Sequence, residues 1–233
     1  MKLPKETNQP EPAHGRWYDD ACGSAFGMEL LGERWSLLIL RELMFGPRRF
    51  TDLRADLPGI SAKVLTERLA GMERSGILCR ATLSDPAPAQ VYRLTPWGQS
   101  AEPILQEIGR WAAASPQHDP TLPLSAASFM MSLRTMLDRQ AAAGLSVTAA
   151  MTVGNAHFSL RLAQSRLEVV RGRPDAADLA FEAETAPRLA ALFYGNVAPE
   201  VAGVTCRGAP ETLRRFSDLF NLPEKTAAPN GGR

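Results

Sequence analysis

Positively charged side chains gather in one stretch of this chain. Between Arg48 and Arg93 there are eight Lys or Arg residues and five Asp or Glu residues, although the whole chain of 233 residues has a formal net charge of only +1. Guanidinium and ammonium groups bind phosphate by charge and hydrogen bonds, so such a stretch is typical of a nucleic-acid surface. Because the total charge is near zero, such a surface must come from local arrangement rather than from a polyanion-binding tail.

A helix predicted from Ser61 to Arg74 carries the most specific part of this pattern. Ser61 is a good N-cap, and Leu65, Leu69 and Met72 recur at the helical period, which predicts one buried stripe. The opposite face is small and polar, with Lys63, Thr66, Glu67, Ala70 and Arg74. Such a face suits entry into the major groove of DNA, but an ordinary solvated helix face has the same pattern. Spacing alone leaves both interpretations open.

We expect eight side chains on and around this helix to contact DNA. Ser61, Lys63 and Thr66 are expected near the groove, and Arg68 is expected to flank it. Arg48 and Arg49 precede the helix and would hold the phosphate backbone. Arg80 and Arg93, on the following hairpin, would reach phosphate or the minor groove.

The elements before this helix complete a helix-turn-helix. Apolar residues from Glu33 to Phe45 predict a helix that is apolar nearly all round and that Gly46-Pro47 ends. Thr51 is expected to cap a short helix that Pro58-Gly59 ends. A tight turn then leads directly to Ser61.

The elements after it predict a wing. Strand-like runs at Ile77–Leu83 and Gln90–Leu94 flank a Pro-rich turn at 84–89, which indicates a β-hairpin. A further helix is expected over 95–114, kinked at Pro103.

A second domain of different pattern follows three prolines at 115–123. The predicted elements are a helix at Ser125–Ala143, strands at Val147–Val153, Ala156–Leu162, Arg166–Arg171 and Asp178–Ala183, a helix at Ala186–Tyr194, a strand at Ala202–Cys206 and a helix at Pro210–Phe220. The fold class is therefore α+β: a mostly helical winged helix-turn-helix with a β-hairpin wing, then an α+β domain with a mainly antiparallel sheet. We expect a flexible arm at 1–16, the first domain at 17–114, a linker at 115–123, the second domain at 124–222 and a disordered tail at 223–233.

The chemistry-bearing residues do not predict an enzyme. The histidines are expected in an arm, a linker and a polar strand position, and the three cysteines are far apart and lack CxxC spacing. No P-loop, GxGxxG or GxSxG pattern occurs. We therefore predict no catalytic residue, no metal and no cofactor. With no long apolar run and no apolar stretch at the start, the chain is expected to be cytoplasmic, without membrane contact.

Four motifs reveal a resemblance to a known family: GERWSLLILREL, GPRRFTDL, PGIS-x-KVLT-x-RL and YRLT-x-x-G. Over about residues 17–115 the chain closely resembles the HxlR-type winged helix-turn-helix transcriptional regulators, which are bacterial. The resemblance implies a DNA-binding homodimer that represses or activates, with the helices at 101–112 and 21–31 forming the dimer. It also places Cys22 where the family often has a cysteine that responds to electrophiles or oxidants. A cysteine that merely packs is the commoner case.

Residues 124–222 resemble the sterol-carrier-protein-2 (SCP-2) like fold through FSLRL, RLEVVRG, DAADLAFEA, LFYGN and GVTCRGAPETLRRF. The resemblance implies an apolar tunnel for a lipid or acyl-like molecule, which would serve as an effector pocket, or else a platform that supports the dimer. For the candidate lining residues, ordinary core packing is the commoner role. They are Phe129, Met130, Leu133, Met136, Leu137, Met151, Phe158, Phe181, Leu192 and Phe193.

These features together predict a sequence-specific transcription regulator that binds an inverted-repeat operator in duplex DNA as a homodimer. A hydrophobic small-molecule effector or a redox signal would modulate it. The alternative is a lipid or acyl-chain carrier whose N-terminal module serves only dimerisation.

Overall fold

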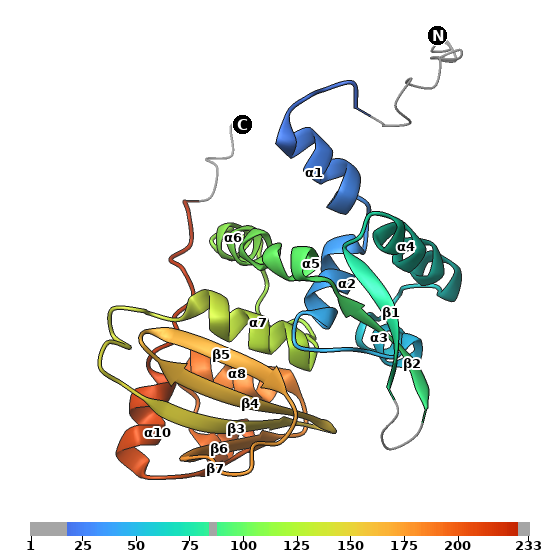
Figure 1. Ribbon diagram of the computed structural model, residues 1–233. Coiled ribbons are helices and arrows are strands. Elements are labelled where there is room, and N and C mark those ends of the chain that lie inside the picture. The colour runs from blue at the N-terminus through green and yellow to red at the C-terminus, as the bar shows by residue number, and fades with distance from the viewer. Residues whose placement is uncertain (1–17, 84–87, 228–233) are drawn as a thin grey trace.

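A computed structural model describes residues 18–83 and 88–227 of the chain. The expected arm with His14, the centre of the predicted wing turn and residues 228–233 lie outside the described residues. An N-terminal group of helices with a β-hairpin packs beside a five-stranded sheet with its own helices (Figure 1). The overall class is α+β, as predicted. No helix in the described residues has the length and apolar character needed to cross a membrane.

The N-terminal part has the order expected of a winged helix-turn-helix. Its elements are α1 (Gly23–Leu31), α2 (Ser36–Leu43), α3 (Phe50–Asp56), α4 (Ala62–Arg74), β1 (Leu78–Leu83), β2 (Ala89–Leu94), α5 (Pro96–Ser100) and α6 (Glu102–Ala113). β1 and β2 pair antiparallel from Leu78 opposite Leu94 to Leu83 opposite Ala89. Arg48 adds a single bridge to Tyr92, so the wing has a minimal third strand.

Two expectations about these helices were wrong. Thr51 does not cap α3: the helix begins at Phe50 after an extended Arg49, and Thr51 lies inside it. The single kinked helix over 95–114 is instead two helices that meet at Ala101. Pro103 has no N–H to donate to the carbonyl of Gln99, so the helical ladder is interrupted there.

The C-terminal part is one sheet covered by helices. Its elements are α7 (Ala126–Met136), β3 (Val147–Val153), β4 (Ala156–Ala163), β5 (Arg166–Arg171), β6 (Leu179–Ala183), α8 (Ala186–Gly195), α9 (Pro199–Ala202), β7 (Val204–Arg207) and α10 (Pro210–Ser217). The strand order is β5-β4-β3-β6-β7, in which β3 and β6 are parallel and the other neighbours antiparallel. The sheet is mainly antiparallel, as predicted.

The helix expected to reach Ala143 ends seven residues earlier, at Met136. Leu137 is extended and forms a β-bridge with Phe220, close to the end of the described chain. Asp138 then accepts hydrogen bonds from the N–H groups of Gln140 and Ala141, both at 2.9 Å, and so begins a turn. A partner far along the chain therefore decides where this helix ends.

The two parts share one apolar core. The ring of Phe45, just after α2, meets the ring of Phe158 on β4 edge-on, with centroids 6.1 Å apart. The Phe45 carbonyl accepts a hydrogen bond from the Arg171 N–H at 3.3 Å, and buried Glu42 accepts one from the Ser125 hydroxyl at 2.6 Å. Residues 115–123 thus connect two bodies that are packed together.

Helix α6 has two different faces. On one face, Glu102 forms an ion pair with Arg134 at 3.0 Å, and Arg110 donates to the Thr135 carbonyl at 2.7 Å, so α6 is attached to α7. On the opposite face, a stripe of large apolar side chains faces solvent, with exposed fractions of 48% for Ile104, 44% for Ile108 and 80% for Trp111. We call these three the α6 stripe.

Part of the predicted tail is fixed to the end of α6. The Lys225 ammonium donates to the carbonyls of Ala113 at 3.0 Å, Ser115 at 3.1 Å and His118 at 3.1 Å. Ala113 is the last residue of α6, so its carbonyl has no partner within the helix, and a cation there is favourable.

Candidate nucleic-acid interface

Helix α4 is built as the sequence predicts. The Ser61 hydroxyl accepts a hydrogen bond from the N–H of Val64 at 3.2 Å, which caps the helix. Leu65, Leu69 and Met72 are at most 3% exposed and hold the helix against the core. Burial of side chains of this size stabilises the domain by about 1.5–3 kcal/mol each.

The opposite face of α4 is open. Ser61, Lys63, Thr66, Glu67 and Arg74 are all exposed, and the Thr66 hydroxyl donates to the Ala62 carbonyl at 2.9 Å within the helix. Ser61, Lys63 and Thr66, which are expected near the groove, therefore share an accessible surface at the start of the helix. Lys63, Arg49 and Arg93 are exposed and have no ion pair among the described residues.

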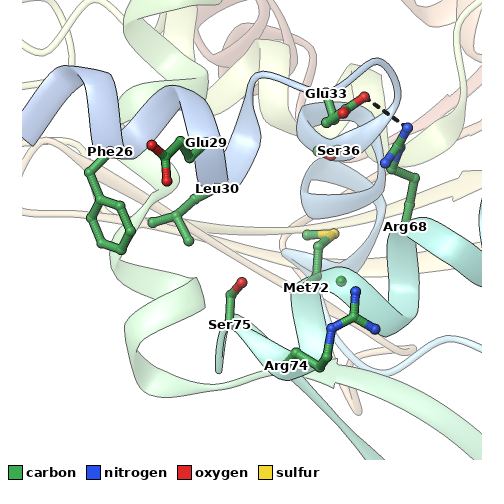
Figure 2. A pocket seen from close by; sticks show the side chains of 10 residues that line it. Phe26, Glu29, Leu30, Glu33, Ser36, Arg68, Met72, Arg74 and Ser75 are labelled. Carbon is green, nitrogen blue, oxygen red and sulfur yellow. Dashed lines mark hydrogen bonds and ion pairs between the residues drawn. The ribbon is translucent and has the colours of Figure 1, made fainter. Parts of the chain in front are cut away.

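Arg68 is held rather than free. Its Nη2 lies 2.8 Å from Oε2 of Glu33, and its Nε donates to the Arg34 carbonyl at 3.3 Å. Figure 2 shows this pair at one side of a pocket between α1 and α4. The pocket has a volume of about 370 Å³; Phe26, Glu29 and Leu30 of α1 line one wall, and Met72, Arg74 and Ser75 line the other.

Two further arginines of the expected set already have partners. Arg48 is paired with Asp56 and only 14% of its side chain is exposed, so its guanidinium faces the protein. Arg80 on β1 lies 3.1 Å from Glu73 and stacks 5.7 Å above the Tyr92 ring, with about half of its side chain exposed. The structure thus places Ser61, Lys63, Thr66, Arg49, Arg80 and Arg93 on the accessible surface. Arg48, Arg68 and Arg80 are each paired with an acid.

Two exposed arginines of the N-terminal part were missing from the expected set. Arg34 touches Arg68 through its carbonyl, and its own guanidinium lies 5.4 Å from the centroid of the Trp35 ring. Arg54 is exposed on α3. The signal for Arg34 was its place inside the GERWSLLILREL motif, but only the fold brings it beside α4.

Cys22 stands at the N-terminus of α1. Its thiol is exposed and lies 2.9 Å from the Ser24 hydroxyl. The hydrogen bond from Ser24, assisted by the N–H groups of Ser24 and Ala25, lowers the pKa of the Cys22 thiol below its usual range. Cys206, in contrast, has its thiol pKa raised by burial and by the nearby Glu200 carboxylate.

The residues expected to line an apolar tunnel are mostly buried, and three of them pack ring against ring. The Phe193 ring lies 5.7 Å from Phe129 and 5.1 Å from Phe181, measured between centroids. Eight of the ten are buried, and Leu137 and Leu192 are partly buried. Aromatic contacts of this kind fill the space between α7, α8 and the sheet.

Comparison with known proteins agrees with this geometry. A family model described as HxlR-like helix-turn-helix matches residues 30–119. The transcriptional regulator YodB of Bacillus subtilis (strain 168) is 40% identical over 89 residues, which are 38% of this chain and 78% of YodB. The uncharacterized HTH-type transcriptional regulator YkvN of the same organism is 36% identical over 91 residues, which are 39% of this chain and 77% of YkvN.

The chain belongs to the HxlR-like helix-turn-helix family. It is therefore a helix-turn-helix transcriptional regulator that binds DNA. A solved reduced form of YodB is 34% identical, with a TM-score of 0.38, over 43% of this chain and 100% of that chain. A quinone-bound form of YodB is 36% identical, with a TM-score of 0.34, over 38% of this chain and 93% of that chain. A diamide-treated form is 37% identical, with a TM-score of 0.35, over 39% of this chain and 91% of that chain. The family assignment rests on the sequence matches, and the family model does not extend past residue 119.

Proposed function

We propose that this HxlR-like regulator binds an inverted-repeat operator in duplex DNA as a homodimer, with α4 in the major groove. The observation that carries this is the exposed polar face of α4, with Lys63 and Thr66 at its start and the buried leucine stripe behind it. A helix presented in this way can reach base edges, while Arg49 and Arg93 hold phosphates on either side.

The dimer is proposed from the exposed apolar surface of two helices. The α6 stripe and α1, where Met28 is 55% exposed, have little of their own chain to pack against. Two copies related by a twofold axis would bury both surfaces and present two α4 helices to half-sites about one helical turn apart.

The test is a double substitution on α4. Lys63→Ala together with Arg68→Ala should abolish specific binding to a selected operator in a fluorescence-anisotropy titration, and leave the circular dichroism spectrum unchanged. Arg161→Ala with Arg207→Ala removes the same charge from the C-terminal sheet and should leave specific binding intact. Full retention of specific binding by the α4 variant would refute the assigned interface.

We also propose that Cys22 senses electrophiles. A lowered pKa gives the thiol more of the nucleophilic thiolate form at neutral pH. Addition of the Cys22 thiolate to a quinone forms an S–C bond, and the quinone takes the electron pair and a proton to become a hydroquinone, so no other oxidant is required. Benzoquinone should add once to Cys22 by mass spectrometry and change operator affinity. Cys22→Ser should abolish both effects and Cys206→Ser neither; a response that survives Cys22→Ser would exclude this role.

The C-terminal domain is proposed to have an SCP-2-like fold, which the mainly antiparallel sheet and its covering helices support. Both a hydrophobic effector in this domain and the carrier alternative need an apolar space for the ligand. The buried side chains of Phe129, Phe181 and Phe193 fill part of that space by packing against one another. Native mass spectrometry of the purified chain tests the effector and the carrier alternative. A co-purified apolar molecule would support them, whereas a mass equal to that of the chain alone would count against both.

A further inference from the structure

A second pocket lies where α5 and α6 meet the C-terminal domain. It has a volume of about 290 Å³, near the lower end of small-ligand sites, which run from about 300 to 1,000 Å³. Gln99, Ser100 and Glu102 line it from the N-terminal side, and Arg134, Arg139 and Arg166 line it from α7, the turn after it and β5. We call this the arginine pocket.

The charges in the arginine pocket do not balance. Three guanidinium groups and one carboxylate line it, and that carboxylate is already occupied: Glu102 lies 3.0 Å from Nε of Arg134 and also accepts from the Gln106 amide at 3.0 Å. Arg139 and Arg166 are exposed and have no ion pair among the described residues. An anion placed between them would be attracted by two guanidinium groups that form no ion pair among the described residues, although the Glu102 carboxylate also acts on Arg166 at longer range.

Arg134 is fixed in position by its surroundings. Its guanidinium lies 5.7 Å from the centroid of the Phe45 ring, and only 23% of its side chain is exposed. Burial lowers the Arg134 pKa and the Glu102 carboxylate opposes this shift; nearby Arg166 lowers the pKa further, and the Glu168 carboxylate raises it. A held guanidinium with hydrogen-bond donors still available is preorganised for an oxyanion, because little side-chain freedom is lost on binding.

The arginine pocket stays open in the proposed dimer. At 3.6 residues per turn, Glu102 and Gln106 lie on the opposite side of α6 from the α6 stripe. Figure 1 places α4 and the wing on the far side of α2 from α6, so the arginine pocket is separate from the DNA-binding face. A concave site of this size away from that face fits a small molecule better than a nucleic-acid backbone.

We propose that the arginine pocket binds a small metabolite carrying a doubly charged oxyanion, either a phosphate monoester or a dicarboxylate. Arg166 contacts the anion from β5, Arg139 from the turn after α7, and Arg134 from α7 itself. The ligand would join the C-terminal domain to the start of α6 at the break after α5, and would therefore act on the helix that carries the proposed dimer surface. This regulatory consequence rests on the proposed function, whereas the binding site does not.

The experiment is calorimetric titration of the full chain, without DNA, at constant ionic strength. The two probes are succinate and glycerol 1-phosphate, and their neutral counterparts are succinamide and glycerol. We expect saturable binding of one molecule of at least one anion per chain, with a Kd of about 1 mM or tighter, and no binding of either neutral compound. Arg139→Ala with Arg166→Ala should weaken that binding by about tenfold or more, because two charge-assisted contacts are lost.

Arg161→Ala with Arg207→Ala is the matched control. Both residues are exposed arginines of the same sheet and line no part of the arginine pocket, so anion binding should remain. Failure of both anions to saturate, or an equal loss in the control, would overturn the site. Operator binding measured with and without the bound anion then tests regulation separately, because coupling must appear as a changed DNA affinity. If the anion binds and DNA affinity does not change, the regulatory consequence is overturned and the site is retained.

Discussion

Arg68 of α4 is held 2.8 Å from Glu33, which lies between α1 and α2. A guanidinium expected to flank the DNA groove is thus neutralised by a carboxylate from the segment that carries α1. About a quarter of the Arg68 side chain and half of the Glu33 side chain are exposed. Since an ion pair this exposed contributes about 0–1 kcal/mol, DNA phosphate can compete for Arg68 at little cost.

Glu33→Gln should therefore tighten DNA binding. The substitution removes a negative charge beside α4 and frees Arg68 for phosphate, so we expect affinity for nonspecific duplex to rise a few-fold and the salt slope of binding to steepen by about one. Fluorescence anisotropy across a series of KCl concentrations measures both. Glu29→Gln removes the same charge from the same pocket without touching Arg68 and should have a smaller effect. Unchanged or weaker binding by Glu33→Gln would contradict the competition.

The α6 stripe should decide the oligomeric state. Ile108 is 44% exposed and lies between Ile104 and Trp111 on this face. Ile108→Asp would bury an unpaired charge in the proposed interface, so sedimentation velocity should show monomers where the natural chain shows dimers. Val170→Asp, on a side chain 62% exposed on β5, is the control and should leave the dimer intact. A dimer that withstands Ile108→Asp would exclude this face.

Local patterns were sufficient to predict α4 and the wing from the sequence. The Ser61 cap, the stripe of Leu65, Leu69 and Met72, and the two strand runs depend on neighbours a few residues away. Strands β3 and β5 were predicted with their observed ends for the same reason, since the Gly154 turn fixes the first hairpin.

What the sequence did not predict depends on distant partners. The early end of α7 comes from the pairing of Leu137 with Phe220, and the orientation of Arg48 comes from Asp56. No spacing rule predicts that Phe45 packs on Phe158 or that Arg68 reaches Glu33, because these contacts exist only after the two domains and α1 are in place. The candidate DNA-binding positions were therefore predictable, whereas which of their side chains are already paired was not.

Burial of Glu42 should make stability depend on pH. Its side chain is fully buried, and this burial raises the pKa of the carboxyl, although Arg41 and the Ser125 hydroxyl oppose the shift and Asp56 adds to it. The folded state then holds the Glu42 proton more tightly than the unfolded chain does. The contribution of Glu42 to the free energy of unfolding is therefore largest below the ordinary carboxyl pKa. It decreases as pH rises through the raised pKa of the folded state.

Glu42→Gln removes this titration while its amide oxygen still accepts from Ser125. In urea unfolding between pH 4 and pH 8, the natural chain should lose more stability than Glu42→Gln as pH rises. Glu42→Ala should cost about 1–3 kcal/mol throughout, because the Ser125 and Arg41 donors lose their acceptor. Parallel profiles for the natural chain and Glu42→Gln would show that Glu42 does not titrate in this window.

Phe45 should couple the unfolding of the two domains. It is 4% exposed, contacts the Phe158 ring edge-on, and lies beneath the Arg134 guanidinium, so its removal leaves a cavity between α2, β4 and α7. Phe45→Ala is expected to cost about 3–5 kcal/mol and to split a single calorimetric transition into two, because each domain then melts without its neighbour. Trp97→Ala, an equally drastic truncation of a side chain 50% exposed on α5, should keep one transition with a small shift. If Phe45→Ala still melts in one step with a loss below about 1 kcal/mol, the shared core does not hold the domains together.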